Sequence, residues 1–584
     1  MTSVQAALKT LRLSMKPGRA GFRVSPLVPI ALAPMLVLLC LVFVVIWISF
    51  QAGFIGSPEV SYSLANYRIV FADALAYRAA FNTLVFALVT TFFAIAIGVP
   101  IAWLTERTTM QRKTLIYLIM TVGLLIPGLF VAMGWTFIAH PRIGFLNLWL
   151  LDVLGLERPP INIATPVGMG FVQGLNLASL AFILTVQMLR SMNPALEEAA
   201  RTAGMGFLAT LRRVTLPLAM PGLLAAAVYV FIVGIATFDI PAVLGLGNRV
   251  YMLSTYIYIQ AFPPDSVPKY GIIAALGTGM MVVALLLTVW YGQVLRRGNR
   301  YQVITGKGYR PKPVDLGRWT IAAWTFIGLY ALMSKVLPIA LVAFMAFMPY
   351  VSAPSLEMLG QATLANFGRV NWDLVLRGLR NTVTLMLVVP VVVLLVSFCI
   401  SWLVVRSRSR LRYALEFGAF LPHTLPEILF ALGALMLALF VLRGYIPIYG
   451  TVWLIALVYV IARLAFATRA MNSSLLQIHK ELEEAAYVAG LGVLRTARRI
   501  VLPLVRPAAL AVWLWTALLV YREVTVAVFL SGRDSITLTA VVWDLWQNAG
   551  STQASVITLL MLILFCPLLV LYWRFARRSA LAPD

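Results

Sequence analysis

The stretch EEAARTAGMGFLATLRRVTLPLAMP covers residues 197–221, and a close copy, EEAAYVAGLGVLRTARRIVLPLVRP, covers residues 483–507. Each residue of the first copy maps onto the second by adding 286 (483 − 197). Both copies share an opening pair of glutamates, two glycines, an Arg-Arg pair and a Leu-Pro pair. A polar segment of this kind does not easily repeat by chance, so the chain is a tandem duplication.

The composition places this chain in a lipid bilayer. Hydrophobic residues make up 61% of its 584 residues, charged residues make up only 11%, and the mean hydropathy is +0.91. Apolar stretches of about 20 residues favour membrane-spanning helices over the shorter, alternating strands of a barrel. We therefore expect an all-α polytopic membrane protein of about twelve transmembrane helices, near residues 27–50, 79–105, 115–138, 166–189, 220–242, 272–295, 320–349, 379–405, 415–441, 446–468, 508–530 and 554–575.

The charge distribution predicts the orientation of these helices. The net charge is +25, and the basic residues gather in every second loop between the predicted spans. Cytoplasmic loops carry such an excess of Lys and Arg. We expect both termini and both repeated segments in the cytoplasm, and a basic excess that reflects topology and not nucleic-acid binding. No small-residue cleavage site of the A-x-A kind follows the apolar run after the basic N-terminus, which indicates an uncleaved first helix.

The duplication extends beyond the repeated segment. SLANYR resembles TLANFG at an offset of 300 (363 − 63), and Asn82-Thr83 recurs at an offset of 299 (381 − 82). Because the offset falls to 286 at the repeated segment, we expect extra residues of the first half in an outward loop near 139–165. Six spans per half is an even number, so the halves are parallel repeats about an axis along the membrane normal. Other matching pairs are Trp103/Trp402, Arg107/Arg406, Pro127/Pro426 and Gly134/Gly433.

The repeat also predicts how the chain is divided. Two six-helix halves are joined by a polar linker and flanked by short cytoplasmic ends, and each half contains one copy of the repeated segment as a loop. The expected parts are a segment 1–26, a first half 27–295 with its loop at 193–219, a linker 296–318, a second half 319–576 with its loop at 479–505, and a tail 577–584.

The repeated segment itself predicts a pair of short helices. Good helix formers run up to Gly204, a residue suited to a helix C-terminus, and a second helix through 208–214 would end at Pro217. An amphipathic loop resting on lipid headgroups is the alternative. Two near-identical copies in matching places favour docking onto a partner that itself comes in two copies. The face that this partner could approach closely would be formed by Ala199, Ala200 and Ala203.

This pattern resembles the coupling loop of ABC importer permeases, in which E-A-A-x-x-x-G is followed by about a dozen residues and L-P before the penultimate span of a half. The resemblance implies a type I, MetI-like transmembrane domain in a bacterial inner membrane. It also implies two copies of a separate ATPase subunit and a periplasmic substrate-binding protein. The residues that it assigns to ATPase coupling are Glu197, Glu198, Ala200, Gly204, Arg212, Arg213, Pro217, Glu483, Glu484, Ala486, Gly490, Arg498, Arg499 and Pro503.

Two further motifs suggest the substrate. L-A-N-Y/F ahead of the second span of each half and T-G-K-G-Y-R-P at Thr305–Pro311 are similar to the fused permeases of ferric-iron importers. This resemblance implies ferric iron as the substrate, and related permeases for thiamine, 2-aminoethylphosphonate or polyamines remain alternatives. An ion-coupled secondary transporter also uses duplicated halves, but it has no ATPase to dock. A membrane scaffold without a substrate is a weaker alternative.

The sequence predicts no catalysis of its own. It contains no G-x-x-x-x-G-K-[ST] phosphate-binding loop, because Gly308 follows Lys307 where Ser or Thr is needed. Its three histidines are scattered, and its three cysteines all lie inside predicted spans without metal-ligand spacing. We expect a transport subunit and not an enzyme, with no cofactor and no metal site, and with ATP hydrolysed on separate subunits.

Ionisable residues at membrane depth are candidates for the substrate path. A charge near the bilayer centre costs about 2.5–3.5 kcal/mol on insertion scales, so it normally faces protein or water. Structural alternatives are a pair of Arg522 with an acid inside the bundle, and a headgroup position for Asp239. Pro127 and Pro426 would break the third and ninth helices, where freed carbonyls can line a cavity. The candidate path residues are Asp239, Glu427, Arg522 and Glu523.

Overall fold

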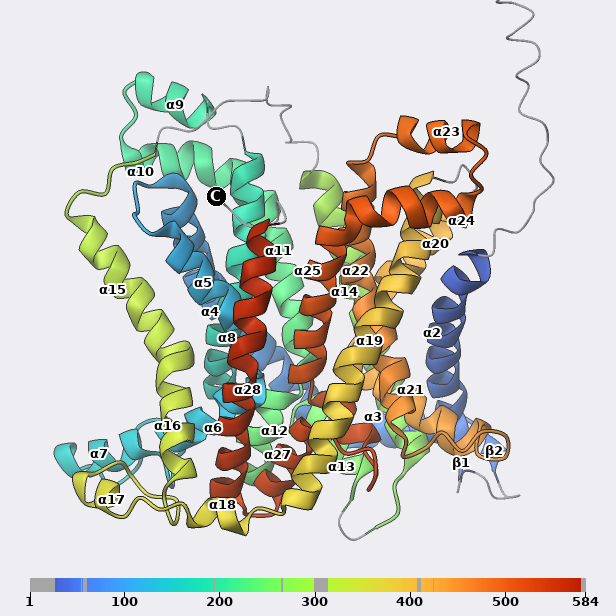
Figure 1. Ribbon diagram of the computed structural model, residues 1–584. Coiled ribbons are helices and arrows are strands. Elements are labelled where there is room, and N and C mark those ends of the chain that lie inside the picture. The colour runs from blue at the N-terminus through green and yellow to red at the C-terminus, as the bar shows by residue number, and fades with distance from the viewer. Residues whose placement is uncertain are drawn as a thin grey trace, which may run out of the picture.

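The computed structural model describes residues 27–53, 55, 60–192, 195–263, 266–298, 313–406, 411–423 and 425–578. Within these residues the secondary structure is helical apart from one two-stranded antiparallel sheet and an isolated bridge between Thr108 and Val314. The expected segment 1–26, most of the linker with Lys307, and residues 579–584 lie outside the described residues. The long helices run side by side, and short helices lie across both ends of the bundle (Figure 1).

Both halves follow the same succession of elements. The first half comprises α2 (Leu27–Ser49), β1 (Gln51–Ala52), β2 (Ser61–Tyr62), α3 (Ala65–Ala72), α4 (Ala74–Arg107), α5 (Lys113–Leu125), α6 (Gly128–Ala139), α7 (Phe145–Leu154), α8 (Pro166–Ser191), α9 (Ala195–Thr202), α10 (Phe207–Thr210), η1 (Leu211–Thr215), α11 (Leu216–Ala236), α12 (Asp239–Gly245), η2 (Leu246–Asn248), α13 (Leu253–Ala261) and α14 (Tyr270–Gly298). The second half comprises α15 (Trp319–Ala331), η4 (Leu332–Val336), α16 (Leu337–Ala346), α17 (Leu356–Gly360), α18 (Ala365–Arg369), α19 (Trp372–Arg406), α20 (Leu411–Phe420), η5 (Leu421–His423), α21 (Glu427–Met436), η6 (Leu437–Val441), α22 (Val452–Leu476), α23 (Glu481–Val488), α24 (Val493–Thr496), η7 (Ala497–Val501), α25 (Leu502–Arg522), α26 (Thr525–Leu530), α27 (Leu538–Gln547) and α28 (Ser551–Arg578).

The number of spanning helices differs from the predicted twelve. Within the described residues, ten helices are long and apolar enough to cross a membrane, and the bent pair α5–α6 makes an eleventh if it is counted as one span. The difference arises at the predicted spans 115–138 and 415–441, because each of these is two shorter helices. None of these four helices reaches the roughly 20 residues that a span requires.

Proline breaks both of these spans, as the sequence predicts. α5 and α6 meet at an angle of 94°, and Pro127 stands at the N-cap of α6. The residue before it, Ile126, has an extended backbone with ψ of 128°, which the proline ring favours in its predecessor. In the second half, Pro426 likewise stands at the N-cap of α21.

The first helix of each half packs against the other half. In the first half, α2 packs against α14 of its own half and α21 of the other half. In the second half, α15 continues through η4 into α16, and α16 packs against α28 of its own half and α6 of the other half. Two matching glycines allow these close contacts, since a Cβ on Gly134 would overlap Pro338 and one on Gly433 would lie 2.7 Å from the carbonyl oxygen of Leu41. The halves are therefore interlocked at the two broken spans.

The asparagines shared by the two halves have the same structural role in each. In the L-A-N motif, the Asn66 amide donates to the carbonyls of Ser49 and Gln51 at 3.0 and 2.7 Å, and Asn366 donates to those of Ala346 and Met348 at 3.1 and 2.6 Å. Each pair of hydrogen bonds is made to backbone carbonyls at or just after the C-terminus of a helix, α2 in the first half and α16 in the second. The asparagine of this motif therefore stabilises the chain after the helix by hydrogen bonds to its backbone.

The extra residues of the first half form a short helix outside the bundle. The connection from α6 to α8 covers residues 140–165 and contains α7, whereas the matching connection from η6 to α22 covers only 442–451. α7 lies at the end of the bundle opposite α9 and α23 (Figure 1). Its position agrees with the predicted location of the additional residues near 139–165.

Candidate functional site

The repeated segments form two helix pairs at the same end of the bundle. α9 and α10 lie on the surface beside α11, and α23 and α24 lie beside α25 (Figure 1). In each pair a short helix is followed by a turn, a second short helix and a π-helical turn that continues into a long helix. The two π-helical turns, η1 and η7, start 286 residues apart (497 − 211), so the copies agree in backbone as well as in sequence.

A glycine with a positive φ ends the first helix of each pair. Gly204 has φ of +83° and Gly490 has φ of +79°. After α9, Met205 N–H donates to the Ala200 carbonyl and Gly204 N–H to that of Arg201, both at 3.0 Å. The same two bonds, at the same length, close α23. This double bond pattern is a Schellman motif, which requires a left-handed residue and is typically built on glycine.

The prolines of the segment do not end the second helix, so the prediction that Pro217 does is wrong. The chain runs on through Pro217 into α11, and through Pro503 into α25. Each proline lies in the first turn of its long helix, where a missing N–H breaks no intrahelical bond. The π-helical turn before it is closed by Leu216 N–H donating to the Leu211 carbonyl, five residues back.

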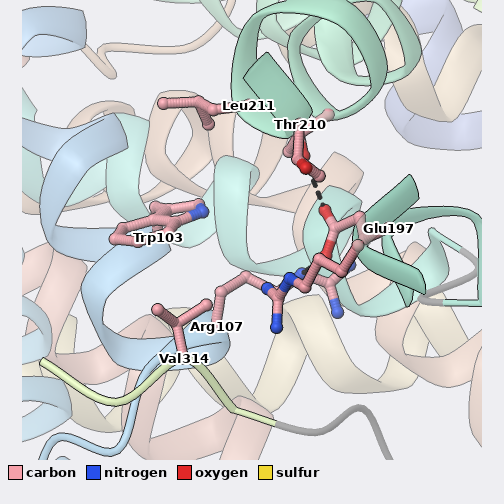
Figure 2. A pocket seen from close by; sticks show the side chains of 8 residues that line it. Trp103, Arg107, Glu197, Thr210, Leu211 and Val314 are labelled. Carbon is pink, nitrogen blue, oxygen red and sulfur yellow. Dashed lines mark hydrogen bonds and ion pairs between the residues drawn. The ribbon is translucent and has the colours of Figure 1, made fainter. Parts of the chain in front are cut away.

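A buried ion pair holds the first helix pair in place. The Nε of Arg107, at the end of α4, lies 3.8 Å from Glu197 Oε2 on α9. The Thr215 hydroxyl donates to Glu197 Oε1 at 2.9 Å, and Arg107 Nη2 donates to the Leu189 carbonyl in the last turn of α8 at 2.9 Å. Figure 2 shows Arg107 and Glu197 in a small pocket that Trp103 also lines.

The second helix pair has the same anchor in a tighter form. Arg406 Nε lies 2.8 Å from Glu483 Oε1, and Nη2 donates to the carbonyls of Leu475 and Ile478 at 3.1 and 3.0 Å. Neither Arg107 Nε nor Arg406 Nε has a hydrogen-bond partner, so both contacts with the glutamates are ion pairs without a hydrogen bond. Val501 stands where the first half has Thr215, and its side chain has no hydroxyl to donate.

The predicted coupling residues fall into three groups by their exposure: buried, half-buried and exposed. Glu197 and Glu483 are only 7% and 5% exposed, and they turn inward to their arginines. The expectation that Ala200 lies on an approachable face is wrong, because it is 5% exposed and packs inward, as does Ala486. Glu198 is half-buried. The exposed members are Gly204, Arg212, Arg213, Pro217, Glu484, Gly490, Arg498, Arg499 and Pro503.

The end of the linker is hydrogen-bonded to the backbone around Arg107, the arginine of the first ion pair. Val314 N–H donates to the Arg107 carbonyl at 2.8 Å, and Thr109 N–H donates to the Val314 carbonyl at 3.0 Å. The Thr109 hydroxyl also donates to Asp315 Oδ1 at 3.2 Å. Val314 lines the pocket of Arg107 and Glu197 (Figure 2). The chain that joins the halves therefore contacts the base of the first helix pair.

The four predicted path residues lie at breaks in the helices. Asp239 opens α12 after the break that follows α11, and Arg522 and Glu523 stand at the corresponding break between α25 and α26. Glu427 opens α21 and forms a two-bond ion pair with Arg463 of α22, at 2.6 and 3.2 Å. Among the described residues no acid lies within 4 Å of Arg522, so the predicted internal pair of Arg522 with an acid is absent there.

Sequence reasoning missed two cations that also lie inside predicted spans. Arg463 lies inside the predicted span 446–468, and Lys335 lies inside the predicted span 320–349. Lys335 donates to Asn176 Oδ1 at 2.6 Å and is buried. Charged residues inside otherwise apolar spans were the available signal for both. Among the described residues, no cluster of three or more His, Cys, Asp or Glu side chains could hold a metal ion.

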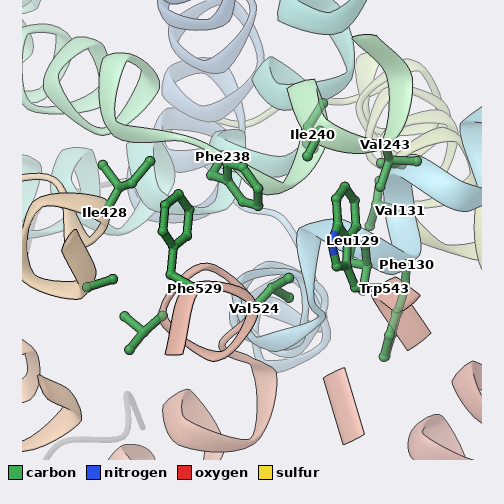
Figure 3. Close-up of a cluster of buried hydrophobic side chains, with 14 of the residues drawn as sticks. Leu129, Phe130, Val131, Phe238, Ile240, Val243, Ile428, Val524, Phe529 and Trp543 are labelled. Atoms are coloured by element: carbon green, nitrogen blue, oxygen red, sulfur yellow. The ribbon is translucent and has the colours of Figure 1, made fainter. Parts of the chain in front are cut away.

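Aromatic side chains from both halves meet at the end of the bundle away from the helix pairs. Phe238 lies 5.9 Å, between ring centroids, from both Phe529 and Trp543 of the second half, and Tyr258 lies 5.7 Å from Phe529. Figure 3 shows Phe238 and Phe529 facing each other within a buried apolar cluster. These aromatic side chains pack the two halves against each other at that end of the bundle.

Two similar helical halves, each with an anchored helix pair at the same end of the bundle, define a duplicated helical membrane protein. The chain belongs to the family of binding-protein-dependent transport system inner membrane components, which matches residues 74–300 and 397–579, more than half of the chain. It is thus an ABC importer permease and a multi-pass inner-membrane protein. Subunits of this family transport, and they are not enzymes.

Curated relatives agree with this assignment at modest identity. The chain is 26% identical over 514 residues to a probable ABC transporter permease protein, y4fN, of Sinorhizobium fredii, covering 87% of each chain. It is 24% identical over 492 residues to the Fe(3+)-transport system permease protein FbpB 2 of Haemophilus influenzae, covering 83% of this chain and 87% of the relative. It is 25% identical over 239 residues to the spermidine/putrescine transport system permease protein PotB of Escherichia coli, covering 40% and 83%.

Proposed function

We propose that this chain is the membrane-spanning subunit of a ferric-iron importer that is driven by two copies of an ABC ATPase and fed by a periplasmic binding protein. The duplicated helix pair, anchored by the same Arg–Glu contact in both halves, is the observation that carries the ATPase part. Similarity to ferric-transport permeases over most of the chain supports the substrate. Similarity to a polyamine permease keeps that substrate as the second candidate.

The exposed side of each helix pair is the proposed ATPase contact. Ala199, Ala203, Ala485 and Ala489 are exposed small residues on or beside the first helices. The two Arg pairs lie on the π-helical turns η1 and η7 that follow the second helices. The inward glutamates and their arginines then act as positioning residues, since they touch the bundle and not the partner. The anchor transmits a movement of the ATPase directly to α4 and α19, whose ends carry Arg107 and Arg406.

The orientation and the division of the chain follow from the same proposal. With the helix pairs in the cytoplasm, the ends at 1–26 and 577–584 and the linker 296–318 are cytoplasmic, and the α7 and α13 connections are outside. The halves are 27–295 and 319–576, with coupling loops at 193–219 and 479–505. The exposed basic side chains Arg212, Arg213, Arg498 and Arg499 beside the helix pairs favour this orientation.

Uptake assays test the substrate. A strain lacking this chain is expected to lose ATP-dependent uptake of radiolabelled ferric iron, and a plasmid copy is expected to restore it together with co-purification of the ATPase encoded nearest to its gene. Uptake of thiamine, 2-aminoethylphosphonate and spermidine is measured in parallel. If the deletion strain takes up iron normally but has lost uptake of one of these three compounds, that compound and not ferric iron is the substrate.

Cysteine labelling tests the orientation. In a background where Cys40, Cys399 and Cys566 are replaced by alanine, Glu157→Cys and Ser266→Cys should react with a membrane-impermeant maleimide in intact cells. Arg318→Cys should react only after permeabilisation. All three positions are exposed, whereas Asn147, which bonds three carbonyls in the same loop as Glu157, is buried and unsuitable. Labelling of Arg318→Cys in intact cells would invert the topology and remove the coupling assignment.

A further inference from the structure

Three charged side chains from three different spans converge on the break in the third span, residues 123–128. Lys335 comes from η4, Arg522 from the end of α25, and Asp239 from the start of α12. A Cβ on Gly123 would lie 3.4 Å from Lys335 Cε, and a Cβ on Gly128 would overlap the Asp239 carboxylate. The Arg522 guanidinium donates to the Leu124 carbonyl, which lies between them in sequence.

The two cations of this group are paired only with neutral oxygens. Lys335 is 8% exposed, and its ammonium donates to the amide oxygen of Asn176. Arg522, which is half-buried, donates to a backbone carbonyl. No acid of the described chain lies within 4 Å of either cation, although Asp239 lies within electrostatic reach of both. A buried cation with only neutral partners keeps most of its desolvation cost.

The acids at the same depth have partners already. Glu427 has both oxygens on Arg463. Glu523 accepts from the N–H groups of Val526 and Ala527 at 3.0–3.3 Å, in the first turn of α26. The Asp239 carboxylate lies at the start of α6 and accepts from Ile240 N–H at 2.9 Å, so helix N-termini compensate its charge. The positive charges of Lys335 and Arg522 are therefore the ones that have no acid as a direct partner among the described residues.

The second half shows that this arrangement is specific to one break. Gly128 corresponds to Glu427 at the offset of 299 (427 − 128), and Arg463 binds that glutamate. The break at Pro426 thus contains its own counter-charge, while the break at Pro127 contains two cations and one acid. Both halves have a proline-marked break, but only at the first do the named cations outnumber the acids.

We propose that Lys335 and Arg522 bind an anionic group of the transported substrate, a carboxylate or phosphonate, as it passes the break at 123–128. This inference rests on the proposed importer function and narrows its substrate class. Ferric iron then crosses as an anionic chelate and not as the bare cation, and a polycation is disfavoured by the surplus charge. The planar guanidinium and the ammonium together suit an oxyanion that accepts several charge-assisted hydrogen bonds.

Paired charge variants test the proposal in cells that contain the ATPase and the binding protein. The probes are radiolabelled ferric citrate, 2-aminoethylphosphonate and spermidine. Lys335→Gln/Arg522→Gln should lower uptake of the anionic probe that the wild type imports by about tenfold or more, as loss of charge-assisted contacts predicts. Lys335→Arg and Arg522→Lys, which keep the charge, should each retain about half of the uptake or more. Membrane level and ATPase co-purification should match the wild type.

Asp239→Asn provides a second measurement with the opposite sign, and it does not depend on the folding of the double variant. Removing the acid should raise uptake of the anionic probe, because Asp239 is the negative charge that competes with the probe for Lys335 and Arg522. Loss of that uptake in Asp239→Asn, or full uptake in Lys335→Gln/Arg522→Gln, overturns the proposal. So does a wild type that imports only spermidine. A wild type that imports none of the probes in an ATP-dependent manner removes the proposed function, and the inference with it.

Discussion

Arg406→Met is expected to abolish transport while the protein still reaches the membrane at its normal level. The change removes the Nε that lies 2.8 Å from Glu483 and the Nη2 that binds the carbonyls at the end of α22. It leaves Glu483 buried without a cation, and removing one partner of a buried ion pair costs about 3–5 kcal/mol. Hydrogen exchange of the α23 backbone amides should rise about a hundredfold or more, which corresponds to the lower of these energies.

Two further variants separate the anchor from a general loss of stability. Arg406→Met/Glu483→Met replaces both charges by apolar side chains of similar length, which is often neutral, so α23 protection should return. Arg499→Met removes an exposed arginine of the same helix pair and should leave exchange of α23 unchanged. Unchanged protection of α23 in Arg406→Met would contradict the anchor.

The matching change in the first half should have a smaller effect. Arg107 Nε is 3.8 Å from Glu197, and the Thr215 hydroxyl still donates to that carboxylate when the arginine is gone. The Val314 N–H donates to the backbone carbonyl of Arg107, so this bond also survives the substitution. Arg107 and Arg406 therefore occupy matching positions, but the first helix pair is also held by Thr215 and the linker, so the second depends more on its ion pair.

The duplicated architecture could be predicted because it depends on local signals. Apolar length indicates spans, basic loops indicate topology, and the repeated segment contains the glycine that its turn needs. The count differs from twelve at 115–138 and 415–441, because apolar length alone does not separate a straight helix from a broken one such as α5–α6, which is bent by 94°. The prediction that Pro217 ends a helix is wrong for a related reason, because a proline that is typical of a helix end is also tolerated in the first turn of a helix.

The charged contacts could not be predicted, because their partners are far apart along the chain. Arg107 and Arg406 were visible as repeated landmarks, but nothing local connects them with Glu197 and Glu483, some 90 and 77 residues later (197 − 107 and 483 − 406). The small side chains of Ala199, Ala200 and Ala203 predict one outer face, but which side of α9 is buried depends on the contact of Glu197 with Arg107. Pairing of Glu427 with Arg463 likewise depends on how α21 and α22 pack.

The turn between the two short helices is the other position where a single change should have a large effect. Gly204 and Gly490 adopt the left-handed conformation, and a Cβ at either position would meet no atom within 4 Å. A substitution there is therefore costly through backbone strain and not through a clash. Gly206, two residues later, is equally unobstructed and has no positive φ, so it is a matched control.

Gly204→Val/Gly490→Val is expected to abolish uptake and ATPase co-purification while membrane insertion stays normal. A left-handed conformation costs an L-residue about 1–2 kcal/mol, and β-branching adds to that cost, so the Schellman bonds at Ala200 and Ala486 should open. Gly204→Asn/Gly490→Asn should retain most of the uptake, because Asn tolerates this conformation. Gly206→Val should behave as the wild type. Equal uptake in the Val and Asn pairs would show that the turn geometry does not control coupling.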